Sequence, residues 1–298
     1  MPGPSRFPLP LIAAFFALYV IWGSTYLVIR IGVEYWPPLM LGGIRFLAAG
    51  AVMYGYLRWR GVPAPTWEQW KACAKIGILL LTFGNGAVTL AEHSGVSSGV
   101  AALAVATVPL FTLLCGYFWG ARNTRLEWAG VILGIAGIAM LNMGSTLQSS
   151  SMGAALLLFA AASWAFGSVW SRRLPLPQGA MASAAEMLVA GVTLLIGSAL
   201  TGERLHAMPP VEGWLALAYL AVFGSIIAFN AYMYLLKHVR PAAATSYAYV
   251  NPAVAVLLGI VFVGETIGME EALAMLVIIS AVLLISLPQW RKPKPEIR

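Results

Sequence analysis

The sequence predicts an all-α membrane protein with ten transmembrane helices, arranged as two inverted five-helix repeats around a central cavity. Three observations lead to this fold class. Of the 298 residues, 60% are hydrophobic and only 10% are charged, whereas a soluble domain carries roughly 25% charged residues. Apolar stretches long enough to cross a bilayer follow one another along the whole chain. Residues also recur at an almost constant offset between the two halves.

The individual spans lie between charged or Pro/Gly-rich breaks. A hydrocarbon core about 30 Å thick requires about 20 mostly apolar helical residues, and about ten segments meet that requirement. The expected spans, in chain order, are 11–32, 38–58, 72–91, 96–119, 126–143, 153–171, 180–200, 213–236, 242–263 and 269–287. The joints between them are short, so the chain leaves no room for a separate soluble domain.

Basic residues concentrate at alternate breaks, which fixes the expected topology. Fifteen of the 18 Lys and Arg residues fall on one side. These are Arg6, Arg58, Arg60, Lys71, Lys75, Arg122, Arg125, Arg172, Arg173, Lys237, Arg240, Arg291, Lys292, Lys294 and Arg298. This positive-inside pattern predicts a multi-pass protein of the inner (plasma) membrane with both termini in the cytoplasm. The net charge of +7 therefore reflects topology and does not indicate a nucleic-acid partner.

The two halves show a weak internal repeat. An offset of 143 residues places Pro109 on Pro252, and an offset of 142 places Trp22 on Trp164. Each half then contains five spans, and an odd unit enters the membrane in the opposite sense the second time. The expected parts are a first repeat at 1–145, a second at 152–290 and a basic cytoplasmic tail at 291–298, with the substrate site between the repeats.

Several short motifs carry a resemblance to a known family. WGSTYLVIR lies in the first span, Ile44–Phe46 (IRF) in the second and LLGIVFVGE at the end of the ninth. Together with the five-plus-five arrangement they resemble the EamA-type branch of the drug/metabolite transporter superfamily. Length and tryptophan content are similar to the YddG-type aromatic amino acid exporters within it. One departure is FWGAR, which places Arg122 where the second repeat has Glu265, so a role for a symmetric Glu pair is not expected.

Polar and aromatic residues inside apolar spans are candidates for lining a cavity, because a polar group that faces lipid has no hydrogen-bond partner. Tyr247 and Asn251 share one helical face, and Tyr249 points in a different direction. The candidate substrate-binding residues are Trp22, Tyr26, Asn85, Trp164, Ser168, Asn230, Tyr247 and Asn251. The alternative for each is ordinary packing, or anchoring of the aromatic rings at the membrane interface.

Pro109 and Pro252 are candidate hinges, because proline removes a backbone donor and can bend a membrane helix. Charges within spans are costly and indicate function by default, and the candidates are Arg30, Arg45 and Glu186. In the repeat alignment Arg45 corresponds to Glu186. Each lies ~10 Å from the start of its own span at 1.5 Å per residue, and the repeats start on opposite faces. Arg45 is therefore expected in the outer third and Glu186 in the inner third, without a direct ion pair.

The chain lacks the motifs that typify enzymes. HExxH, Walker-type, dinucleotide-binding and metal-holding acidic motifs are absent, and Cys73 and Cys115 have no metal-ligand spacing. The expected function is a secondary transporter without cofactor or metal, exporting aromatic or other amphipathic amino acids and related metabolites by alternating access. The alternative class is a membrane-embedded enzyme or a receptor-like binding protein. Small-xxx-small spacings serve either internal packing or a homodimer, and the remaining partners are the solute and the lipid bilayer.

Overall fold

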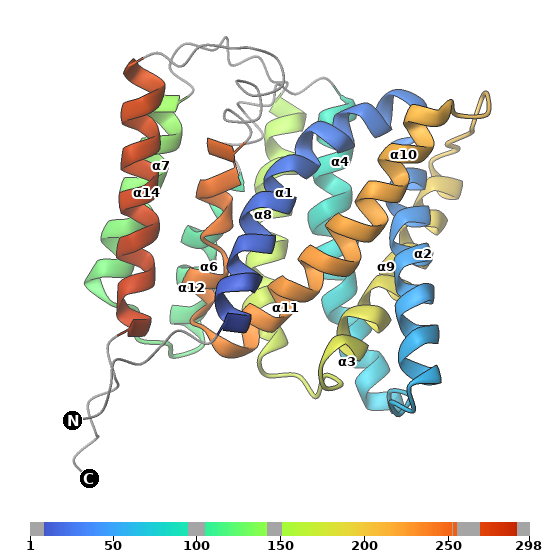
Figure 1. Cartoon of the computed structure of the whole chain (residues 1–298), viewed down its shortest axis with the longest axis horizontal. Coiled ribbons are helices and arrows are strands. Elements are labelled where there is room, and N and C mark those ends of the chain that lie inside the picture. The colour runs from blue at the N-terminus through green and yellow to red at the C-terminus, as the bar shows by residue number, and fades with distance from the viewer. Residues whose placement is uncertain (1–8, 95–104, 142–150, 252, 255–268, 291–298) are drawn as a thin grey trace.

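The computed structural model describes residues 9–94, 105–141, 151–251, 253–254 and 269–290, and every regular element in these ranges is helical. The first half contains α1 (Leu9–Tyr35), α2 (Pro38–Trp59), α3 (Trp67–Gly77), η1 (Ile78–Asn85), α4 (Gly86–His93), α6 (Val108–Phe118) and α7 (Arg125–Leu141). The second half contains α8 (Ser151–Ser171), α9 (Ala180–Leu200), α10 (Val211–Tyr219), η2 (Leu220–Ile227), α11 (Ala228–His238), α12 (Pro241–Ala244) and α14 (Met269–Trp290). Figure 1 shows these helices standing side by side across the molecule.

Helix ends fall where the sequence supplies suitable caps. Pro38 occupies the first turn of α2, where its missing N–H costs nothing. Glu203, from the second half, accepts hydrogen bonds from the free backbone N–H groups of Leu39 and Met40 at 3.0 and 2.9 Å, and its charge also suits the positive end of the helix. A capping box between Thr66 and Gln69 starts α3. The cap that Glu203 provides at the start of α2 ties the two halves together.

Two long helices contain a π-helical segment in the middle. α3, η1 and α4 form one continuous helix, Trp67–His93, and α10, η2 and α11 form another, Val211–His238. Both segments have eight residues, and they begin at Ile78 and Leu220, an offset of 142. The hydropathy of these two stretches predicts ordinary transmembrane helices. A π-helical turn changes the backbone hydrogen-bond register, and such turns often occur at functional sites.

The halves approach one another most closely where α2 packs against α9. A Cβ atom added at Gly191 would lie 2.5 Å from the backbone nitrogen of Leu47, and one added at Gly50 would lie 2.8 Å from that of Leu188. Aligning Gly50 with Gly191 also aligns Leu47 with Leu188, so the contact is reciprocal. Reciprocal contacts of this kind characterise an isologous, two-fold interface. α2 and α9 therefore run antiparallel with equivalent residues facing one another.

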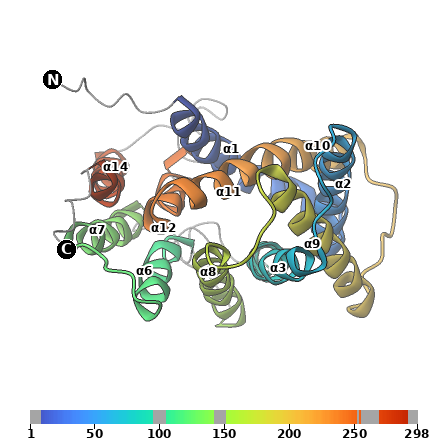
Figure 2. The ribbon, with the colours of Figure 1, turned by 90° about the horizontal axis from the view of Figure 1, so that it is seen from below.

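A second antiparallel pair, α7 with α14, stands at the edge of the molecule (Figure 2). Gly130 lies against Ile285 and Gly137 against Ile278. Gly134 lies against the ring of Tyr249, so this small-residue face is used for packing within the chain. The first turn of α7 is held to the rest of the protein by Glu127, which forms an ion pair with Arg240.

The described helices account for part of the expected span count. Four of them are long and apolar enough to cross a membrane: Pro38–Trp59, Trp67–His93, Ala180–Leu200 and Val211–His238. α1 makes a fifth if its two parts, Leu9–Thr25 and Leu27–Tyr35, are taken as one bent span. The spans expected at 96–119 and 242–263 lie partly outside the described residues, so the count of ten stays a prediction.

The α2–α9 contact should depend on the absence of a side chain at Gly191. Gly191→Ala should destabilise the protein by about 1–3 kcal/mol, because the new methyl group meets backbone atoms that cannot move aside. Gly55→Ala on α2 is the matched control, since nothing lies within 4 Å of its Cβ position. The measurement is the midpoint of thermal unfolding of the purified protein in detergent. Equal midpoints for the two variants would contradict the close contact.

Candidate functional site

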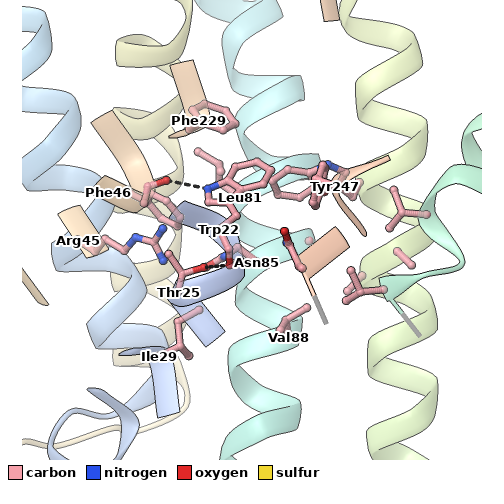
Figure 3. Close-up of a pocket in the computed structure, with 18 residues that line it drawn as sticks. Trp22, Thr25, Ile29, Arg45, Phe46, Leu81, Asn85, Val88, Phe229 and Tyr247 are labelled. Atoms are coloured by element: carbon pink, nitrogen blue, oxygen red, sulfur yellow. Dashed lines mark hydrogen bonds between the residues drawn. The ribbon is translucent and has the colours of Figure 1, made fainter. Parts of the chain in front are cut away.

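A cavity lies between the two halves, beside both π-helical segments. Its volume, counted as the space that the centre of a water molecule can occupy, is about 80 Å³. The first half contributes Trp22, Thr25, Ile29, Arg45, Phe46, Leu81, Gly84, Asn85, Val88, Val105 and Val108, and the second contributes Ala160, Ala161, Trp164, Gly224, Phe229, Tyr247 and Asn251 (Figure 3). The cavity is mostly apolar with a few polar groups, which is the usual composition of a small-molecule site.

Four aromatic side chains from four helical segments form a cluster at the cavity. Trp22 lies at its centre, with ring centroids 5.5 Å from Trp164, 5.3 Å from Tyr232 and 4.8 Å from Tyr247. Edge-to-face and tilted contacts at such distances stabilise an aromatic cluster. Trp22, Trp164 and Tyr247 also line the cavity, whereas Tyr232 lies behind them.

Tyr232 and Ser168 fix the orientation of Trp164 through a closed set of hydrogen bonds. The indole N–H of Trp164 donates to the Tyr232 hydroxyl at 2.9 Å, and the hydroxyls of Tyr232 and Ser168 are bonded to each other. Ser168 donates to the backbone carbonyl of Trp164 at 2.6 Å, so Tyr232 is left as the donor to Ser168. Each of the three donors is thereby used once. Ser168 supports the wall from behind and is not among the lining residues.

The first helix is tied to η2 by the indole of Trp22. Its N–H donates to the carbonyl oxygen of Gly224 at 3.0 Å (Figure 3). Gly224 lies inside the π-helical segment, where altered backbone register leaves carbonyl groups available to other donors. This bond therefore connects the aromatic wall of one half to the irregular helix of the other.

Arg45 is a buried cation in the cavity wall. Only 4% of it is exposed, its Nε donates to the Ser225 hydroxyl at 2.8 Å, and its guanidinium lies 4.8 Å from the centre of the Phe46 ring. It is the charged member of the set of lining residues. Within the described ranges no carboxylate lies within ion-pair distance of it. A buried charge without a partner is costly, so this cation marks a place for an anionic group.

Glu186 lies elsewhere and does not pair with Arg45. It is fully buried on α9, where its backbone lies against Gly77 at the end of α3. Neither carboxylate oxygen has a hydrogen-bond partner among the described residues, and Lys237 supplies the nearby positive charge. Arg45 and Glu186 thus occupy different environments, and their depths in the membrane stay a prediction.

The three asparagines predicted to bind the solute differ in their surroundings. Asn85 lines the cavity from η1. Asn230 instead donates to the Ile226 carbonyl at 2.6 Å and to the sulfur of Met53 at 3.1 Å, and it is not a lining residue. Asn251 lines the cavity with 1% exposure, and its amide has no partner among the described residues. An unsatisfied buried amide costs about 1–3 kcal/mol, which a bound solute or water would relieve.

The remaining sequence candidates fall outside the cavity wall or outside the described residues. Arg30 is exposed on α1. Pro109 lies in the first turn of α6, so it begins a helix and does not interrupt one. Tyr249 turns away from Tyr247 and reaches the carbonyl of Val131 on α7. Pro252 and the side chain of Tyr26 are not described.

Sequence reasoning missed three groups that shape the site: Gly224, Ser225 and Tyr232. Ser225 and Tyr232 are polar groups in an apolar span, which is the same signal that singled out Asn230. Their partners could not be inferred because they come from α2 and α8, far away in the chain.

Comparison with known proteins identifies the family. The model of the EamA-like transporter family matches residues 9–143 and again residues 151–287. This chain belongs to the EamA family. The protein named "Uncharacterized inner membrane transporter YedA" of Escherichia coli K12 is 56% identical over 290 residues, which cover 97% of this chain and 95% of that protein.

More distant relatives of this EamA chain are also similar over most of their length. The "Probable amino-acid metabolite efflux pump" of Salmonella typhimurium LT2 is 28% identical over 272 residues, covering 87% of this chain and 89% of the relative. A solved crystal structure matches with a TM-score of 0.75 and 23% identity, over 95% of this chain and 99% of that chain, and this likeness concerns the fold alone. The family and the relatives are transporters by name, so this EamA protein is a transporter of the drug/metabolite superfamily and not an enzyme.

The hydroxyl of Tyr232 should be important for stability. Tyr232→Phe removes the acceptor of the Trp164 N–H and the donor to Ser168, and it should destabilise the protein by about 1–3 kcal/mol because those groups stay buried. Tyr56→Phe, at an exposed tyrosine of α2, is the control with the same atom removed. Thermal unfolding in detergent measures both. A Tyr232→Phe protein as stable as the Tyr56→Phe protein would show that the network contributes nothing.

Proposed function

We propose that this EamA transporter is a multi-pass protein of the inner membrane that exports aromatic or other amphipathic amino acids and related metabolites through the cavity between its halves. The Escherichia coli relative is named an inner membrane transporter and the Salmonella relative a probable amino-acid metabolite efflux pump. Both names agree with this proposal.

The observation that carries the proposal is the composition of the cavity wall. Arg45 offers a buried cation, Trp22 and Tyr247 offer aromatic faces, and Asn251 offers an amide with no partner among the described residues. An amino acid has groups complementary to each: a carboxylate for the cation, a side chain for the rings and a polar group for the amide. A site of this kind binds an amphipathic solute by charge-assisted hydrogen bonds and apolar contact.

We propose that the two halves, 1–145 and 152–290, are inverted repeats. Two observations support this relation. Gly50 lies against Leu188 as Gly191 lies against Leu47, and η1 and η2 begin 142 residues apart, which is also the offset between Trp22 and Trp164. In Figure 1, α1 runs from the lower to the upper edge of the molecule and its counterpart α8 runs the opposite way. In such an arrangement each half can adopt the conformation of the other, which exchanges the open and closed faces of the cavity.

The proposed orientation places both termini in the cytoplasm and the cavity nearer the outer face. On α1 the lining residue Trp22 lies at the middle of the helix, and Thr25 and Ile29 lie in its C-terminal half. On the N-terminal side of Trp22, the Tyr19 hydroxyl is bonded to that of Ser246 at 2.7 Å. In this proposal the aromatic cluster and the Tyr19–Ser246 bond close the cytoplasmic side. Pro109 and Pro252 remain candidate hinges for opening it.

Transport should depend on Tyr247 and Asn251. Aromatic contacts contribute on the order of 1 kcal/mol, so Tyr247→Ala should weaken apparent affinity roughly five- to tenfold. Asn251→Ala should act similarly, because it leaves the polar group of the solute unpaired. Counterflow of a panel of labelled amino acids in proteoliposomes, at matched protein amounts, measures the effect.

The control for this experiment is Leu283→Ala, at an exposed leucine on α14, which should transport like the unmodified protein. Counterflow by the unmodified protein with any amino acid establishes the solute class. If no amino acid exchanges, the proposed solute is wrong. If Tyr247→Ala and Asn251→Ala both behave like Leu283→Ala, the cavity is not the transport site.

A further inference from the structure

We infer that the cavity recognises its solute by a carboxylate held at Arg45, and that an ammonium group on the solute is dispensable. Organic carboxylates with an aromatic or branched apolar side chain, but without an amino group, are then substrates alongside amino acids. The inference rests on the proposed function, whose solute class it extends to carboxylates without an amino group.

The lining residues of the cavity carry charge of one sign. Arg45 supplies the positive charge, and none of the described glutamates is a lining residue. The sequence contains no aspartate. The other buried or half-buried glutamates that the structure describes have surroundings outside the wall. Glu127 pairs with Arg240, Glu203 caps α2, and Glu186 lies on α9 against Gly77. Glu92 lies on α4 one helical turn beyond the lining residue Val88, near Arg30, and is not itself a lining residue. The wall that a solute contacts in this cavity therefore contains a cation and no compensating anion.

The position of Arg45 leaves its terminal nitrogens available. Its Nε is bonded to Ser225, which in turn donates to the Leu220 carbonyl at 3.0 Å. This pair of bonds fixes the guanidinium, while no described residue accepts a hydrogen bond from the two terminal nitrogens. Figure 3 shows Arg45 on one side of the pocket and Tyr247 on the other, with Trp22 between them. A held guanidinium with free terminal nitrogens suits a carboxylate, which it can bind with two parallel hydrogen bonds.

The polar groups away from Arg45 are neutral. Asn85 and Asn251 are amides, and the Thr25 hydroxyl already donates to the Trp22 carbonyl at 2.7 Å. An amide pairs with an oxo, hydroxyl or ammonium group alike, because it both donates and accepts. An ammonium group would lose its hydration on entering and gain no opposite charge, so its removal from the solute should weaken binding little.

Two sets of matched compounds test the inference on the full-length protein in lipid nanodiscs. The first is L-phenylalanine, 3-phenylpropanoate, which lacks the ammonium, and 2-phenylethylamine, which lacks the carboxylate. The second is L-leucine, 4-methylpentanoate and 3-methylbutylamine. Binding is measured by the change in tryptophan fluorescence, and transport by counterflow in proteoliposomes. In at least one set the deaminated acid should bind within roughly threefold of the amino acid, and the amine should bind at least roughly tenfold more weakly.

Substitutions at Arg45 test whether this residue causes the preference for carboxylates over amines. Arg45→Gln should weaken the binding of both carboxylates by roughly tenfold and leave the amine unchanged, whereas Arg45→Lys should retain the preference for carboxylates. Arg58→Gln, at an exposed arginine of α2, is the control and should behave like the unmodified protein. If Arg45→Gln does not fold, the compound series on the unmodified protein still decides the inference.

The outcomes separate this inference from the proposed function. If the amine binds like the amino acid and the deaminated acid does not bind, recognition runs through the ammonium group and the inference is wrong, while amino acid transport stands. The inference is also wrong if both truncated compounds are rejected, because the ammonium is then required. Failure of every amino acid in the counterflow panel would overturn the proposed function itself.

Discussion

The contact between α2 and α9 determines the rest of the architecture. Its backbones meet directly because Gly50 and Gly191 lack a side chain, and this closeness places each π-helical segment against the second helix of the other half. Arg45 on α2 is bonded to Ser225 of η2, and Thr193 on α9 is bonded to Thr82 of η1 at 2.6 Å. The cavity forms beside these two junctions. Its position is therefore a consequence of helix packing between the halves.

The contrast between satisfied and unsatisfied polar groups supports the proposed solute site. Behind the cavity wall, Trp164, Tyr232 and Ser168 use one another's donors and acceptors in a closed set. In the wall itself, no carboxylate of the described ranges lies within ion-pair distance of Arg45, and the Asn251 amide has no hydrogen-bond partner there. Polar groups inside a membrane protein need internal partners. Arg45 and Asn251 have unused hydrogen-bonding groups and also line the cavity, so a polar solute there can serve them, whereas the unpartnered Glu186 lies away from the wall.

Composition and spacing predicted the helical class and much of the wall. Trp22, Asn85, Trp164, Tyr247 and Asn251 were all singled out because polar or aromatic groups in apolar spans require partners, and the structure places each of them at the cavity.

The presence of a polar group in an apolar span could not show that Ser168 and Asn230 lie outside the cavity wall. A hydroxyl or an amide can equally find its hydrogen-bond partner within the protein, as both do here. The π-helical segments were not predicted, since the hydropathy of ILLLTFGN and LAVFGSII is that of any apolar helix. Their register depends on packing against the opposite half, which is a tertiary effect.

Labelling of the cavity from each membrane face tests whether it is a solute cavity that is closed on the cytoplasmic side. In a chain with Cys73 and Cys115 replaced by serine, Asn85→Cys places a thiol in the wall, and a membrane-impermeant maleimide can be applied to sealed vesicles of either orientation. The account predicts labelling from the face opposite the termini, reduced when solute occupies the cavity. Labelling from the face of the termini alone, or labelling that solute does not affect, would contradict a solute cavity that is closed on the cytoplasmic side.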